Sequence, residues 1–236
     1  VTALVLTALW VKETLAWAHA EGARHAAGKS TGPIPRFPQN ISGQPTTWEV
    51  FTLMSWRDKR MAALSQAGLV EKFVDALIWV VYPVYLYERG LSLAHIGWVV
   101  GVYGFVWGGS QFFTGRLSDR IGRQKPIVWG MWICGAGVAM MLAGEAVWWW
   151  ITSAAVTGFG MALLYPNLSA AVADIAHPNW RGSAIGIYRF WRDLGYGIGA
   201  LALGLVAHLT GNLSSGVWFV AIAMALSGLV VQIWSE

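Results

Sequence analysis

The composition of this 236-residue chain excludes an ordinary soluble domain. Apolar residues make up 56% and charged residues only 12%, against roughly 25% charged residues in a typical soluble domain. Trp is unusually frequent, with 16 residues, and the net charge is +4. A chain of this kind is expected to fold inside a lipid bilayer.

The beginning of the chain differs from the rest. Val1–Val11 is apolar and is expected to be the end of a preceding transmembrane helix. Residues 12–65 are rich in Pro, Gly, Ser, Thr and charge, which predicts a solvated cytoplasmic linker. For Trp48–Arg60 two interpretations remain open: a short amphipathic helix on the membrane surface, or a flexible tether.

Residues 66–236 contain six long apolar stretches. Each comes near the roughly 20 residues that a helix needs to cross the hydrocarbon core, and none alternates as a barrel strand does. We therefore predict an all-α integral membrane protein whose residues 66–236 form a bundle of six transmembrane helices. The predicted spans are Ala67–Glu88, Leu93–Thr114, Ile127–Gly144, Val147–Val172, Ser183–Leu209 and Val217–Trp234.

The positions of Lys and Arg predict the orientation of this bundle. If the linker is in the cytoplasm, all but one of the 16 Lys and Arg residues lie on or near the cytoplasmic side, and only Arg89 lies outside. The positive-inside rule describes this distribution. The positive charge is therefore an orientation signal that also puts the C-terminus in the cytoplasm, and it gives no reason to expect nucleic acid as a partner.

One sequence motif lies between the second and third predicted spans. The stretch Gly115–Lys125 reads GRLSDRIGRQK, with glycines expected at both ends of a tight turn, one acid and several cations. It closely resembles the signature G-x-L-[A/S]-D-R-x-G-R-[K/R] of the major facilitator superfamily. Gln124 stands where the signature has a cation, and Lys125 follows it.

The resemblance covers nearly the whole chain and implies a fold. In that family, two six-helix halves are joined by a long cytoplasmic loop and enclose a substrate site near the midplane between them. Because the linker precedes the motif, this chain resembles the C-terminal half, with helices seven to twelve. The expected partners are then a missing N-terminal six-helix half, a small-molecule substrate and the lipid bilayer.

The resemblance also implies that the motif is a conformational gate on the cytoplasmic side. The gate residues would be Gly115, Asp119, Arg120, Gly122 and Arg123, with Asp119 capping a neighbouring helix or pairing with Arg when this side is closed. The alternative is that these charges only fix topology and turn geometry.

The next cytoplasmic connection carries two further candidates for the gate. Asp174 and Arg181 flank it, one on each side. They either join the gate network or are two solvated loop charges.

Ionisable residues within the predicted spans are candidates for function, because charge inside a bilayer is costly. Glu71, Lys72 and Asp75 form one group, in which the two acids are four residues apart on one helical face. Arg192 and Asp193 belong to a second group, in which Asp193 is expected to pair with Arg189. We expect Asp75, Arg192 and Asp193 to line the cavity or its inner mouth, with Arg192 facing Asp75 or an anionic substrate.

The alternative for both groups is that they are helix ends whose side chains reach the cytoplasmic interface.

Glycines four apart predict close helix packing in two places, at Gly104 and Gly108 and at Gly195 and Gly199.

The sequence contains no arrangement that predicts an enzyme, a metal site or a bound cofactor. The predicted function is secondary active transport of a small solute by alternating access, coupled to protons or another ion. A non-transporting membrane protein with the same fold, regulatory, receptor-like or truncated, is the second hypothesis. The compact loops suit a bacterial inner membrane.

Overall fold

In the computed structural model, the described residues are residue 20 and residues 45–234, and they form helices without a strand. The expected helix end at Val1–Val11 and most of the linker lie outside the described residues. The helices are α3 (Thr47–Thr52), η1 (Leu53–Arg57), α4 (Lys59–Ala76), η2 (Leu77–Val81), α5 (Tyr82–Glu88), α6 (Leu93–Ile121), α7 (Gln124–Met140), α8 (Val147–Ile175), η3 (Pro178–Trp180), α9 (Arg181–Thr210) and α10 (Leu213–Trp234).

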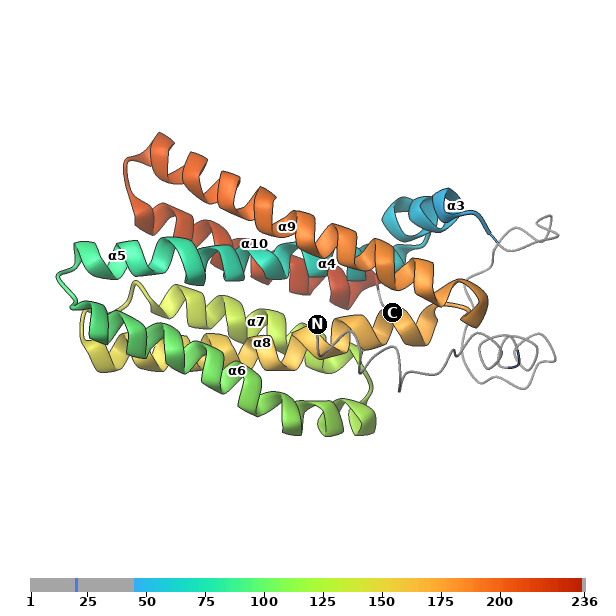
Figure 1. The fold of residues 1–236 in the computed structure, drawn as a ribbon, viewed down its shortest axis with the longest axis horizontal. Coiled ribbons are helices and arrows are strands. Elements are labelled where there is room, and N and C mark those ends of the chain that lie inside the picture. The colour runs from blue at the N-terminus through green and yellow to red at the C-terminus, as the bar shows by residue number, and fades with distance from the viewer. Residues whose placement is uncertain (1–19, 21–44, 235–236) are drawn as a thin grey trace, which may run out of the picture.

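The long helices run up and down along one axis (Figure 1). The turns α6–α7 and α8–α9 lie at the end of the bundle where α3 lies, and the turns α5–α6, α7–α8 and α9–α10 lie at the other end. The two turns that the sequence assigns to the cytoplasm therefore share one end with the helix of the linker.

The first predicted span is a helical run of three pieces that starts earlier than expected, at Lys59. Asp58 caps its start by accepting a hydrogen bond from the Met61 N–H at 2.9 Å. In the middle lies the π-helical turn η2, in which the Tyr82 N–H donates to the Leu77 carbonyl five residues earlier. This wide turn comes just before Pro83, which has no N–H and crowds the preceding helical turn.

Helix α8 packs between α6 and α7, α4 packs against α9, and α10 contacts both α7 and α4. Glycines make the closest of these approaches possible. A Cβ on Gly160 would lie 2.5 Å from the Cys134 nitrogen, and a Cβ on Gly158 would lie 2.6 Å from the Tyr103 carbonyl oxygen. Small residues thus let the helix backbones approach where lipid supplies no hydrophobic driving force between helices.

The two predicted glycine pairs have different outcomes. Gly195 and Gly199 of α9 lie directly against α4, where added Cβ atoms would collide with Leu69 and Phe73. The prediction for Gly104 and Gly108 is wrong within the described chain, because a Cβ on either would meet nothing within 4 Å. Residue spacing alone could not distinguish a stripe that faces a neighbouring helix from one that faces outward.

The stretch just before α4 is helical, as one of the two interpretations of Trp48–Arg60 required. Thr46 and Glu49 form a capping box at the start of α3, with the Glu49 carboxylate accepting from the Thr46 N–H at 2.8 Å. Phe51 stacks on Trp191 of α9, and the Trp191 indole N–H donates to Ser55 Oγ at 2.9 Å. This helix is therefore held against α9.

By length and composition, three helical stretches of the described chain could each cross a membrane: Val147–Ile175, Pro178–Thr210 and Leu213–Trp234. The other predicted spans also coincide with helices of the bundle. Helix α7 is 17 residues long, which is shorter than the roughly 20 residues that a span needs, and the run from Lys59 to Glu88 is divided into three shorter helical pieces.

Candidate functional site

The signature motif forms the end of α6 and a very short turn. Helix α6 continues to Ile121, so the prediction of a turn beginning at Gly115 is wrong. Gly115 lies within the helix, and a Cβ there would meet nothing within 4 Å. Gly122 ends the helix with φ of +86°, a conformation that favours glycine, and α7 begins two residues later.

Arg123 is the centre of a polar cluster at this turn. Its Nη1 lies 2.8 Å from Asp119 Oδ1 and donates to Ser118 Oγ at 2.6 Å. Its Nε donates to Asp174 Oδ2 at 3.2 Å, which connects the start of α7 to the end of α8. The structure therefore brings together Asp119, Arg123 and Asp174 from three helix ends.

Two other predicted gate residues lie nearby. Arg120 is exposed in the last turn of α6. Arg181 is half-buried at the first residue of α9. Their part in a gate stays a prediction.

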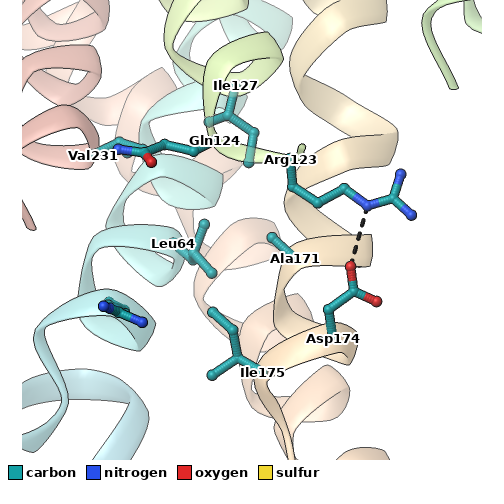
Figure 2. A pocket seen from close by; sticks show the side chains of 9 residues that line it. Leu64, Arg123, Gln124, Ile127, Ala171, Asp174, Ile175 and Val231 are labelled. Atoms are coloured by element: carbon teal, nitrogen blue, oxygen red, sulfur yellow. Dashed lines mark hydrogen bonds and ion pairs between the residues drawn. The ribbon is translucent and has the colours of Figure 1, made fainter. Parts of the chain in front are cut away.

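A pocket of about 160 Å³ adjoins the Arg123 cluster, between α4, α7, α8 and α10 (Figure 2). At its rim the Arg123 and Asp174 side chains point toward one another, and Arg60 and Gln124 add polar groups. The remaining lining is apolar: Leu64, Ile127, Ala171, Ile175 and Val231.

A second group of charges lies near the middle of the bundle. Because the helical run extends from Lys59 to Glu88, Glu71, Lys72 and Asp75 lie near its centre and not at its cytoplasmic end. The side chains of Glu71 and Asp75 are buried, and Lys72 Nζ lies 2.5 Å from Asp75 Oδ2. Charges at this depth need partners, and they are poorly explained by side chains that reach the interface.

Helix α6 also contributes to this group. The Tyr103 hydroxyl, itself fully buried, donates a hydrogen bond to Asp75 Oδ1 at 2.9 Å. Asp75 therefore receives one donor from its own helix and one from α6.

The α9 candidates approach the group from the other side. Arg192 donates twice to Asp193 Oδ1, at 2.9 and 2.8 Å, so Asp193 pairs with its neighbour and not with the expected Arg189. Arg192 Nη1 also donates to the Tyr165 hydroxyl of α8 at 3.4 Å. Arg192 and Lys72 both lie over the Tyr165 ring, 5.5 and 5.1 Å from its centroid. Tyr165 thus stands between the charges of α4 and those of α9.

Three further aromatic rings extend from Tyr165 along the bundle. Trp79 packs edge-on against Tyr103, Tyr103 contacts Trp107, and Trp107 packs edge-on against Tyr165. Trp79 is 47% exposed, whereas Tyr103 is buried. The result is a row of four rings that ends at two cations, with carboxylates behind them.

The contacts of two tyrosines with the charged residues of this group were not predicted from the sequence. Tyr103 and Tyr165 were not expected to bond with charged side chains, because nothing in their local pattern gives the direction of a hydroxyl. Among the described residues, no group of three or more His, Cys, Asp and Glu side chains has an arrangement that could hold a metal ion.

The all-helical bundle, with charged side chains in its interior, is typical of a helical membrane protein. A model of the Major Facilitator Superfamily matches residues 65–235. The chain belongs to this superfamily, and it is an integral membrane protein.

Curated bacterial relatives resemble part of this chain. An uncharacterized MFS-type transporter of Salmonella typhimurium is 30% identical over 135 residues, covering 57% of this chain and 34% of that protein. The inner membrane transport protein YajR of Escherichia coli is 31% identical over 147 residues, covering 62% and 31%. The multidrug resistance protein MdtH of Cronobacter sakazakii is 28% identical over 153 residues, covering 60% and 38%. The chain spans about a third of the length of these relatives.

A solved structure has the same fold. A crystal structure of a mutant of the peptide transporter POT in complex with sulfate superposes with a TM-score of 0.57 at 23% sequence identity. The match covers 92% of this chain and 41% of that one.

Proposed function

We propose that this chain forms the C-terminal half of a secondary active transporter, which moves a small solute by alternating access and is coupled to protons or another ion. Six helical runs cross the membrane: the run from Lys59 to Glu88, then α6, α7, α8, α9 and α10. An N-terminal six-helix half, in the same chain or separate, completes the substrate cavity.

The observation that carries this proposal is the charged group near the middle of the bundle. Charge is costly at that depth and is retained in membrane proteins chiefly along substrate and ion pathways. Asp75, Arg192 and Asp193 are proposed to line the cavity or its inner mouth. The row of rings from Trp79 to Tyr165 supplies the apolar part of the same wall.

The Arg123 cluster is proposed as the cytoplasmic gate. Its contacts join the ends of α6 and α8 through one guanidinium, so a movement of either end must break or stretch a charge-assisted hydrogen bond. Asp119 and Arg120 then contact the N-terminal half when this side is closed.

The orientation follows from the cations. The linker and the turns α6–α7 and α8–α9 are proposed to face the cytoplasm of a bacterial inner membrane, because these segments hold most of the Lys and Arg residues. The C-terminus is proposed to lie on the same side, because α10 runs back from the opposite end of the bundle (Figure 1). Drugs are the first candidate substrates to test, because several relatives are named as multidrug resistance proteins.

Flux tests the proposal. The molecular mass of the protein in its own membrane would be measured first, by immunoblot with an antibody against the linker. Transport requires both halves, so the mass shows whether the N-terminal half is part of the same chain. The protein would then be reconstituted in vesicles and assayed for uptake of candidate solutes with and without an imposed pH gradient. Solute flux that the gradient drives supports the proposal. A folded, complete protein that binds solutes and moves none would favour the non-transporting hypothesis.

A further inference from the structure

Three aromatic side chains form one exposed patch at the end of the bundle where α3 lies. Trp48 of α3, Trp56 of η1 and Phe190 of α9 are 69%, 66% and 52% exposed. All three contact the ring of Phe51, and their centroids lie 5.3, 5.7 and 6.1 Å from its centroid. These four rings are called the α3 patch below. Because the exposed rings are contiguous and not scattered, they mark a surface that binds a partner.

The segment that carries most of the patch is amphipathic and fixed to the bundle. On its other face, Val50, Leu53 and Met54 are buried. Phe51 also stacks on Trp191 of α9, and the Trp191 indole is hydrogen-bonded to η1. Helix α3 lies at the edge of the bundle (Figure 1). A partner can therefore cover the exposed rings without displacing the segment from the bundle.

The position of the patch along α9 corresponds to the boundary of a bilayer. Helix α9 has 30 residues and is therefore about 45 Å long, against about 30 Å for the hydrocarbon core. If α9 is centred in the core, about 7–8 Å of it extends beyond the core at each end. Trp191 follows the first residue of the helix, Arg181, by about 15 Å, which places it about 7–8 Å inside the core. An amphipathic helix on a membrane buries its apolar face to a depth of about 5–10 Å.

The charges beside the patch favour an anionic surface. Three exposed cations are close to the patch in sequence, and within the described chain none of them forms an ion pair: Arg57, Lys59 and Arg189. The neighbouring acids already have partners, because Glu49 and Asp58 cap helix starts and Asp193 pairs with Arg192. Exposed indoles beside available cations suit a leaflet whose lipids have negative headgroups.

We propose that the α3 patch is a binding surface for anionic phospholipid. The rings of Trp48, Trp56 and Phe190 lie among the headgroups and the first acyl carbons, and the three neighbouring cations bind lipid phosphates. The leaflet then supports the segment that joins the linker to α4. Because the same segment contacts α9, the lipid composition acts on the position of α9. This surface does not depend on the transport function.

A nitroxide label introduced at Thr47→Cys, an exposed position beside Trp48, reports what covers the patch. Cys134, the one cysteine of the sequence, is buried and does not take up the label. The full chain is reconstituted in vesicles of phosphatidylcholine, alone or with an equal amount of phosphatidylglycerol. A label covered by lipid collides with dissolved oxygen but not with a water-soluble nickel complex. A label in water collides with the nickel complex, and a label covered by protein collides with neither.

In vesicles with phosphatidylglycerol, we expect the label to be open to oxygen and protected from nickel, more strongly than in phosphatidylcholine alone. Arg57→Gln/Lys59→Gln should shift the equilibrium between lipid and water by up to about 25-fold, since each basic side chain near an anionic surface contributes roughly fivefold. The matched control Arg116→Gln/Lys125→Gln removes two exposed cations at the same end of the bundle. It should leave the nickel accessibility unchanged.

Equal nickel accessibility in the two kinds of vesicle overturns the proposal. A label that neither oxygen nor nickel reaches also overturns it, because protein then covers the patch. If Arg57→Gln/Lys59→Gln disturbs the fold, the two lipid compositions still decide in the labelled chain without further substitution. Trp48→Ala/Trp56→Ala should raise the nickel accessibility, and an unchanged value contradicts a role of the rings. Flux is measured separately, and its absence would refute the transport function while leaving this lipid surface in place.

Discussion

A single methyl group added at Gly195 should separate α4 from α9. A Cβ there would lie 2.8 Å from the Leu69 Cα and carbonyl carbon, and it would overlap the Leu69 carbonyl oxygen. Because ordinary Cβ contacts begin near 3.4 Å, relieving the two carbon contacts alone requires the backbones to move apart by about 0.6 Å, and relieving the overlap with the oxygen requires more. A gap of roughly 0.5–1 Å already forfeits a quarter to a half of the dispersion attraction across a contact.

Gly197, two residues further along α9, is the matched control, because a Cβ there meets nothing within 4 Å. Both changes to Ala remove a helical glycine and raise helix propensity by about 1 kcal/mol, so this gain cancels in the comparison. We expect Gly195→Ala to be less stable than Gly197→Ala by about 1–3 kcal/mol. The free energy of unfolding of the detergent-solubilised chain measures the difference. Equal values for the two variants would refute the close α4–α9 contact.

Three further substitutions test individual contacts. Tyr103→Phe removes a buried donor to Asp75 and should lower the free energy of unfolding by about 1–3 kcal/mol in chemical denaturation; an unchanged value would contradict the hydrogen bond. Asp174→Asn breaks an exposed contact of Arg123, so it should cost less than about 1 kcal/mol of stability yet alter flux if the cluster is a gate. Trp191→Phe removes the indole N–H that holds η1, so amide hydrogen exchange in α3 should accelerate while exchange in α10 stays the same.

The sequence was sufficient to locate most helices, because long apolar runs bounded by turn residues leave little choice of structure. The predicted Val147–Val172 and Ser183–Leu209 lie within α8 and α9, with ends that differ by a few residues. The start of the first run was missed by eight residues. Charged and small residues at Lys59–Gln66 lower its hydropathy, although Met61, Ala63 and Leu64 are buried against the bundle.

This early start changed the interpretation of the central charges. With a helix expected to begin at Ala67, Glu71 and Lys72 appeared to lie near the membrane surface, and side chains reaching the interface explained them. With the helix beginning at Lys59, they lie at its middle. The hydrogen bond from Tyr103 to Asp75 joins residues 28 apart in sequence, so only the packing of α4 against the rest of the bundle could reveal it.

The π-helical turn at Leu77–Val81 has a consequence for comparing this chain with its relatives. An α-helix rotates by about 100° per residue, and the wide turn holds one residue more than an α-helical turn would. Asp75, just before this turn, and Trp79, within it, both reach Tyr103 with this extra residue in place. A relative with a regular α-helix here lacks the extra residue. If it is aligned to this chain without a gap, the residues after the turn are paired with residues that point in a different direction. Alignments should therefore allow a one-residue gap between positions 77 and 81.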